Sequence, residues 1–130
     1  MITIPKKVEY SIILISFLAK NGGKTVSLAE AAKKLNLPYR FLGQLASALK
    51  TAEIITSKEG KSGGYSLSPD WKDRTLYDLL DALGENKHMV KCLSPDEQCA
   101  RAAKCEIRQI WDKIETSFVK ELKNIKLAEI

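Results

Sequence analysis

The pattern of apolar and polar residues predicts three helices in the first part of the chain. Residues 5–20 are apolar around most of a helical circumference, so this helix must be largely buried. Residues 27–35 begin with Ser27 and Glu30, which have the spacing of a capping box, and residues 39–50 place their apolar side chains on one face. A short turn containing Pro38 separates the last two helices, which is typical of a helix-turn-helix.

A β-hairpin is predicted directly after these helices. Residues 54–56 and 65–67 have the composition of short antiparallel strands, and the loop SKEGKSGG between them is rich in glycine and lysine. A hairpin at this place in the chain has the outline of a wing. A plain surface hairpin remains the alternative, because Gly63-Gly64 is also a common turn signal.

Two further helices are predicted, and the second is unusually apolar. Thr75 is a good N-cap for a helix that continues to about Leu83, and Gly84 ends it. One long helix is expected from Cys105 to about Ala128. Its apolar stripe is Ile107, Ile110, Trp111, Ile114, Phe118, Val119, Leu122 and Ile125. Such a stripe commonly packs against its symmetry mate, although folding back over the domain's own core is an alternative for part of it.

Composition and charge narrow the class of protein. The chain of 130 residues has the size of one domain, and its net charge of +5 favours an anionic partner such as nucleic acid. A secretory segment and an apolar run long enough to cross a membrane are both missing from the sequence, so we expect a cytoplasmic protein with no membrane partner. We do not expect an enzyme, since no nucleotide-cradling glycine motif or nucleophile-histidine set is evident.

All three cysteines fall within residues 91–105, at Cys92, Cys99 and Cys105. We call this stretch the cysteine segment. In a reducing cytosol an odd, clustered set of thiols favours metal binding or redox work over structural disulfides. Ser94-Pro95-Asp96-Glu97 has the signature of a helix start, so a helix of one to two turns is expected between Cys92 and Cys105.

Four features together resemble the Rrf2 family of winged-helix transcription regulators, which includes IscR-like, NsrR-like and RirA-like branches. They are the opening residues 3–10, the stretch YRFLGQL at 39–45, the wing from Ser57 through GGYSL at 63–67, and the three late cysteines before a long helix. The resemblance spans nearly the whole chain. It implies a homodimer that binds double-stranded operator DNA and holds an iron–sulfur cluster, 2Fe-2S or 4Fe-4S, through three cysteines per subunit.

The resemblance implies a role for each part of the chain. The fold class is mostly α with a small two-stranded β wing, a winged helix-turn-helix followed by a long C-terminal dimerisation helix. Residues 1–84 would form the DNA-binding domain, residues 85–104 a cysteine-containing cofactor loop and residues 105–130 the dimerisation helix, together one compact unit.

Three cysteines leave one iron position open, and here the chain departs from one branch of the family. The IscR-like branch has a histidine three residues after the third cysteine, whereas this chain has Arg108. The NsrR-like branch places a carboxylate ligand where this chain has Glu9, and that carboxylate reaches the cluster of the other subunit. Glu9 is therefore the first candidate for the fourth ligand, and His88, the only histidine, is the second.

Candidate DNA contacts lie in the helix-turn-helix and the wing. Arg40 and Gln44, with Tyr39 nearby, are expected to face the major groove, where arginine pairs with guanine and glutamine with adenine. Ser27 at a helix start is expected to contact phosphate.

The wing departs from the family pattern in one respect. Lys58 and Lys61 are expected to contact phosphate, but between them Glu59 stands where the family usually has arginine. A carboxylate there is repelled by a narrow minor groove, so minor-groove reading by this wing is not expected. At Gly43 an acidic residue common in the IscR-like branch is missing, so that branch's operator preference does not carry over.

Two other uses of the cysteines remain open. His88 with the three cysteines makes a formal Cys₃His set for structural zinc, although the short cysteine spacing of zinc fingers is missing. A metal-free thiol redox sensor is the second alternative.

Overall fold

The computed structural model describes residues 3–85 and 87–130; the remaining positions of the predicted domain ranges, 1, 2 and 86, lie outside the described residues. The α-helices are α1 (Lys6–Lys20), α2 (Leu28–Leu35), α3 (Tyr39–Thr51), α4 (Leu76–Ala82) and α5 (Glu106–Asn124). The strands are β1 (Ile55–Lys58) and β2 (Gly64–Leu67), and short 3₁₀ turns are η1 (Trp71–Asp73), η2 (Lys91–Leu93), η3 (Ala102–Lys104) and η4 (Leu127–Glu129). The predicted mostly α fold with a two-stranded wing is confirmed.

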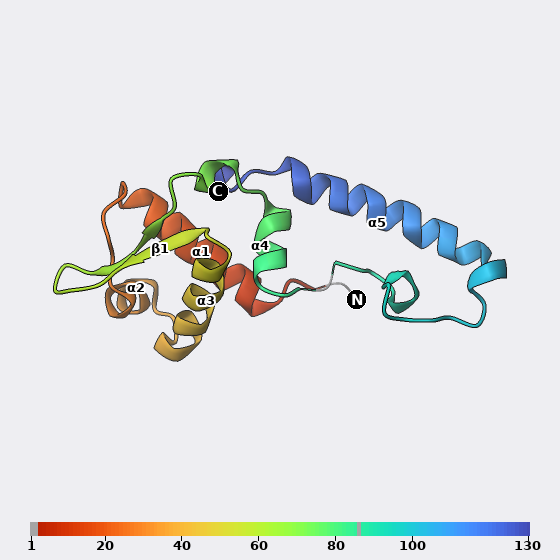
Figure 1. Ribbon diagram of the computed structural model, residues 1–130, viewed down its shortest axis with the longest axis horizontal. Helices are drawn as coiled ribbons and strands as arrows, with labels where there is room; N and C mark the ends of the chain where they lie inside the picture. Colours follow the sequence, from red (N-terminus) through yellow and green to blue (C-terminus); the bar gives the residue numbers. More distant parts are fainter. Residues whose placement is uncertain (1–2, 86) are drawn as a thin grey trace.

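The molecule is elongated, and the predicted DNA-binding elements lie at the opposite end from the cysteine segment (Figure 1). The helices α1, α2 and α3 and the hairpin gather at one end around a shared core. Helix α5 runs away from this body, and the cysteine segment lies beside its far end. The core is formed by apolar side chains from several elements, among them Leu14, Ile15, Leu42, Leu49, Ile54, Leu79 and Leu127.

The helix-turn-helix begins where its capping residue predicts. Ser27 is the N-cap of α2, and its hydroxyl accepts a hydrogen bond from the backbone N–H of Glu30 at 3.1 Å. The reciprocal half of the predicted capping box does not form, because the Glu30 carboxylate pairs instead with Lys34 one turn later. Asn36 adopts the left-handed conformation that ends α2, with a φ of 53°, and the chain turns into α3.

The wing is joined to the chain just before α2. Strands β1 and β2 pair antiparallel from Ile55 opposite Leu67 to Lys58 opposite Gly64. Near the loop end of the hairpin Tyr65 also pairs with Val26, so the wing and the helix-turn-helix share a backbone connection. Thr25 adds a hydrogen bond from its hydroxyl to the Ser62 carbonyl at 2.9 Å.

The long helix is shorter than the sequence predicts. We expected it to reach about Ala128, but α5 ends at Asn124. The six residues 125–130, which we call the C-terminal segment, fold back onto the chain before α4. Leu127 is fully buried there, and its N–H donates to the Arg74 carbonyl at 2.8 Å. Burying Leu127 and pairing the backbone outweighs about one further turn of exposed helix.

The helix expected between Cys92 and Cys105 does not form. Residues 94–97 make a single turn, closed by a hydrogen bond from Glu97 N–H to the Ser94 carbonyl at 3.2 Å. Residues 95–101 are all exposed, so a helix here would have no apolar face to bury. Good capping residues do not offset the cost of starting a short isolated helix.

Candidate DNA-binding and cofactor sites

Helix α3 presents the predicted DNA-contacting side chains to solvent. Its inner face carries Leu42, Leu45, Ala46 and Leu49, all buried in the core. Tyr39, Arg40 and Gln44 lie outside that face and are exposed, Tyr39 by 58 %. A buried apolar face thus fixes the helix, while its polar face remains available to an external partner.

The wing presents its two lysines to solvent. Lys58 ends β1 and Lys61 lies in the loop that follows, and both are exposed, as is Glu59 between them. The strand end next to this loop is held by the pairing of Tyr65 with Val26. Ser27, the predicted phosphate contact, follows Val26 directly, so this part of the wing adjoins the N-terminus of α2.

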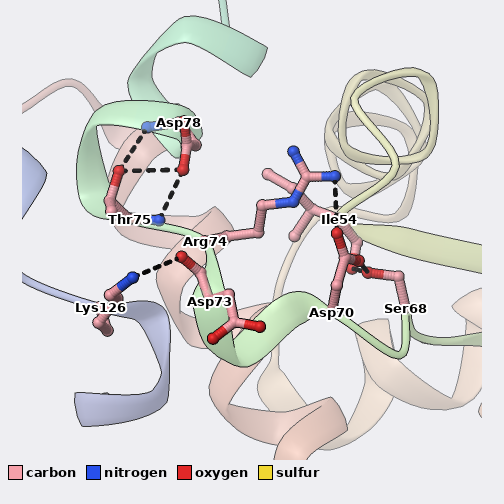
Figure 2. A network of polar contacts seen from close by, with 8 residues as sticks. All are labelled: Ile54, Ser68, Asp70, Asp73, Arg74, Thr75, Asp78 and Lys126. Carbon is pink, nitrogen blue, oxygen red and sulfur yellow. Dashed lines mark hydrogen bonds and ion pairs between the residues drawn. The ribbon is translucent and has the colours of Figure 1, made fainter.

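A polar network connects the wing base with the C-terminal segment (Figure 2). The Ser68 hydroxyl donates to the Ile54 carbonyl and to the Asp70 carboxylate, each at 3.0 Å. Asp70 in turn pairs with the Arg74 guanidinium at 3.1 Å. The hydrogen bond from Ser68 is the largest influence on Asp70 and, with the charge of Arg74, lowers the pKa of its carboxyl against the opposing effect of burial.

The same network includes the start of α4 (Figure 2). Thr75 and Asp78 form a full capping box, as the sequence predicted for the N-cap. On the other side, the Lys126 ammonium donates to the Asp73 carbonyl at 3.0 Å. The C-terminal segment, which follows α5, is thereby connected to the residues before α4. Those residues are in turn bonded to Ser68 and through it to Ile54, and these two residues flank the two strands.

The three cysteines lie at different degrees of exposure and are all free thiols. Cys92 is half-buried in η2, Cys99 is exposed, and half-buried Cys105 is the N-cap of α5. In the part of the chain that the structure describes, the three thiols and the acidic or histidine side chains do not converge into a metal-binding group. The donor chemistry fits an iron–sulfur cluster, but the three thiols would have to be brought together to hold one.

Charged side chains of both signs lie beside Cys105. A hollow of about 690 Å³ is lined by Cys105 together with Arg101, Lys104, Glu106, Ile107 and two alanines.

The two candidate fourth ligands are already engaged. Glu9 lies in the first turn of α1 and pairs with Lys6 at 2.9 Å; its hydrogen bond and its charge raise the pKa of the Lys6 ammonium. His88 is bonded to the Glu115 carboxylate on α5, with 2.8 Å between Nδ1 and Oε1. Neither residue is brought together with the cysteines in this arrangement.

Several residues of the site were not found by sequence reasoning. In the sequence, Glu115 is one more charged residue beside the apolar stripe. Asp70 and Arg74 lie in the connection between the wing and the next helix, where no role was assigned to them. Their partners lie far away along the chain, so no local spacing signals the contact. Only the capping box at Thr75 had a pattern that could be recognised.

Among the described residues, no helix is long and apolar enough to span a membrane. The fold and the exposed face of α3 define a winged-helix transcription regulator of the DNA-binding kind. Residues 4–130 match the Rrf2 family, described as iron-dependent transcriptional regulators, and the chain belongs to that family. Its members are regulators and not enzymes.

Relatives and solved structures agree with this assignment. The protein rrf2 of Nitratidesulfovibrio vulgaris is 29% identical over 94% of this chain and 82% of its own length. The global cysteine regulator CymR of B. subtilis superposes with a TM-score of 0.74 at 29% identity, covering 98% of this chain and 94% of that one. IscR of T. potens gives a TM-score of 0.72 at 25% identity, covering 98% and 84%.

Proposed function

We propose that the chain is a homodimeric transcription regulator whose operator affinity is controlled by an iron–sulfur cluster held by Cys92, Cys99 and Cys105. The observation that carries the proposal is the place of these thiols. All three belong to one segment that begins and ends on α5, at the end of the helix remote from the DNA-binding unit (Figure 1). A change in this segment therefore acts on the helix that would join two subunits.

Helix α3 reads the operator in this proposal. Arg40 and Gln44, beside Tyr39, contact base edges in the major groove, each good bidentate contact contributing roughly 1–3 kcal/mol of discrimination. Ser27 and the first amides of α2 contact one phosphate, and Lys58 and Lys61 of the wing contact others. The exposure of these side chains and the backbone pairing of the wing with Val26 support these roles in DNA binding.

The dimer interface is formed by the exposed half of the α5 stripe. Ile107 is 60% exposed and Ile110 59%, and Trp111, Ile114 and Phe118 continue the same face. Phe118 also borders an apolar groove of about 430 Å³ between α1, α4 and α5, so stripe and groove form one surface. An unpaired surface of this kind favours a second copy of the chain, because a twofold pair buries the same face on both subunits.

The groove also suggests how Glu9 takes part. Pro5, Val8 and Ile12 line it, so the first turn of α1, which carries Glu9, adjoins the surface that the partner subunit would cover. Glu9 could then complete the cluster of the partner after releasing Lys6. His88 is the second candidate, and its release would break the bond to Glu115.

The cluster itself would supply a reversible, charge-rich centre that is sensitive to iron, oxygen or nitric oxide. Closing the Cys99 stretch around it would change the contacts at the end of α5. Through α5 and the C-terminal segment, this would alter the separation of two α3 helices, which must fit half-sites about 34–36 Å apart.

A metal-free thiol sensor is the second candidate function. The exposed Cys99 and the half-buried Cys92 and Cys105 are free, and the likeness to CymR as well as to IscR leaves the use of the cysteines open. In that case a disulfide or sulfenic acid, not a cluster, would change the segment. Structural zinc with His88 is a third use of the same residues.

Anaerobic purification followed by absorption and Mössbauer spectra and by iron, sulfide and zinc analysis decides between these uses. We expect iron and sulfide in equal amounts and a spectrum that is lost in Cys92→Ala and altered in Glu9→Ala. Zinc without sulfide would reject the cluster, and a metal-free protein whose DNA affinity follows oxidation would favour the thiol sensor. Sedimentation of Ile110→Glu, against the exposed polar control Gln109→Glu, tests the dimer.

A further inference from the structure

The carboxylate of Glu115 is covered although it lies on the most exposed helix of the molecule. Its side chain is only 12% exposed, whereas the apolar neighbour Ile114 is 42% exposed. Covering a carboxylate is costly unless hydrogen bonds replace its water. Glu115 must therefore have strong partners, and both lie just ahead of the cysteine segment.

Two hydrogen bonds connect Glu115 with consecutive residues. The Met89 backbone N–H donates to Glu115 Oε2 at 2.8 Å, and His88 Nδ1 lies 2.8 Å from Oε1. Because a carboxylate only accepts hydrogen bonds, His88 donates from Nδ1. The two carboxylate oxygens of Glu115 thus hold the backbone N–H of Met89 and the side chain of His88. These residues are three and four positions before Cys92.

A second attachment lies one residue earlier. Lys87 pairs with Asp81 at the end of α4, and its ammonium lies 4.5 Å from the centre of the Tyr77 ring. Lys123 of α5 approaches the same ring at 4.7 Å. The chain is therefore fixed to α4 and α5 as it approaches Cys92, and η2, which contains Cys92, contacts α5.

The rest of the cysteine segment has no such attachment. Within residues 94–104, as the structure describes them, the hydrogen bonds are local backbone turns such as Ala102 N–H to the Cys99 carbonyl at 3.0 Å. Cys105 is fixed as the N-cap of α5. Cys92 and Cys105 are thus held on one helix, while Cys99 lies on the exposed stretch between them.

We propose that Glu115 is a positioning residue that holds Cys92 against α5, so that the cysteine segment changes state by movement of the Cys99 stretch alone. The proposal rests on the proposed function for its biological meaning, but the attachment acts on the thiols whether they bind a cluster or react directly. Glu115 also follows Ile114 of the apolar stripe, so the attachment places the cysteine segment next to the proposed dimer interface.

The test measures the rate at which a maleimide reagent modifies each cysteine in the reduced, metal-free, full-length protein, resolved by mass spectrometry of the peptides. In Glu115→Ala we expect Cys92 to react about ten- to a hundredfold faster, the range given by losing hydrogen bonds to a charged group. The rate at Cys99 should not change, which makes it the internal reference. Glu121→Ala is the matched control, because the carboxylate of Glu121 on the same helix makes no hydrogen bond or ion pair in the described chain.

An unchanged Cys92 rate in Glu115→Ala would overturn the proposal, and so would equal acceleration at all three cysteines, which would indicate general loosening. His88→Ala, which removes one of the two bonds, should give a smaller acceleration and serves if Glu115→Ala does not fold. Where the purified protein carries a cluster, its loss to a chelator should be faster in Glu115→Ala than in Glu121→Ala. A protein without any cluster would refute the proposed cofactor but leave the alkylation test intact.

Discussion

Val26 and Tyr65 exchange two backbone hydrogen bonds, 2.9 Å from Val26 N to Tyr65 O and 2.8 Å from Tyr65 N to Val26 O. This pair attaches strand β2, near the loop of the wing, to the residue before the N-cap of α2. The wing therefore cannot move independently of the helix-turn-helix. The pair has space to form because the neighbour of Tyr65 on the loop side, Gly64, has no Cβ that would meet the Val26 backbone.

Replacing Gly64 with alanine should detach the wing. A Cβ at Gly64 would lie 2.3 Å from the Val26 carbonyl oxygen and 2.8 Å from the Ser27 nitrogen, and this backbone cannot move aside as a flexible side chain could. Overpacking of this kind costs about 1–3 kcal/mol. We expect Gly64→Ala to lower the free energy of unfolding by at least this amount and to weaken operator binding, measured by chemical denaturation and by fluorescence anisotropy.

Gly60→Ala is the control for the backbone conformation alone. Gly60 also has a positive φ, of +107°, but a Cβ there would meet no atom within 4 Å. Alanine is strained by a positive φ at both positions, so the difference in the free energy of unfolding between the two variants reports the contact with Val26. Equal losses of stability would show that steric contact at Gly64 does not matter.

The same hairpin shows what sequence can and cannot predict. Composition placed the strands and the wing, because turn residues and β-branched residues are local signals. The turn signal at Gly63-Gly64 is confirmed for Gly63, whose N–H closes a turn to the Gly60 carbonyl at 3.0 Å, but Gly64 has a second reason that the sequence does not show: it passes close to the backbone of Val26. A contact with Val26, distant in sequence, leaves no local pattern.

The end of α5 gives a second example. The helical pattern continues to Ala128 in the sequence, yet the helix ends at Asn124 because Leu127 has a place in the core. The apolar stripe consequently divides into an exposed half and a half that packs on the body, with Leu122 buried. Helical periodicity identified the apolar residues but not which surface each half would meet. Glu115 could not be predicted as a positioning residue, since it has the same pattern as any solvated charge.

Leu127→Ala should destabilise the fold strongly. Leu127 is 0% exposed and fixes the C-terminal segment against the residues before α4. Truncating a buried leucine costs about 2–5 kcal/mol. Thermal or urea unfolding would measure the loss, with Ile130→Ala as the control because Ile130 is exposed and its removal should cost less than about 0.5 kcal/mol.

Ser11→Ala should stabilise the protein. The Ser11 hydroxyl is fully buried in α1 and, within the described residues, has no hydrogen-bond partner. Removing an unsatisfied buried hydroxyl should raise the free energy of unfolding by about 1 kcal/mol. Ser16→Ala on the same helix reports the gain in helix propensity alone, about 0.5 kcal/mol, so a Ser11 variant no more stable than the Ser16 variant would contradict the prediction.

The network at Asp70 should contribute to stability in a pH-dependent way. The Ser68 hydrogen bond and Arg74 lower the pKa of Asp70 in the folded chain below the ordinary value of 3.8. A lowered folded pKa gives stability that is fully present above the unfolded pKa and is lost as the pH falls through the folded pKa. Stability should therefore decline with acid in this range, and less so in Asp70→Asn.

Urea unfolding at several pH values from neutral down to the acid range would measure this effect as the difference between wild type and Asp70→Asn. The difference should be constant near neutral pH and shrink as the pH falls below 3.8. Asp96→Asn is the control, because the Asp96 carboxylate is exposed and makes no ion pair in the described chain. A difference that does not vary with pH would remove Asp70 from the acid response.

Substitutions in α3 and in the wing should weaken DNA binding in two distinguishable ways. Arg40→Ala or Gln44→Ala removes a base contact, so affinity for the operator should fall by about 1–3 kcal/mol while affinity for unrelated DNA changes little. Lys58→Ala or Lys61→Ala removes a phosphate contact, so binding should weaken for all sequences and the slope of log affinity against log salt should decrease by about 1. Fluorescence anisotropy with specific and random duplexes at several salt concentrations separates the two, and Lys120→Ala on α5 controls for the loss of one exposed charge. A uniform loss in the Arg40 variant would mean that this side chain holds phosphate and does not read bases.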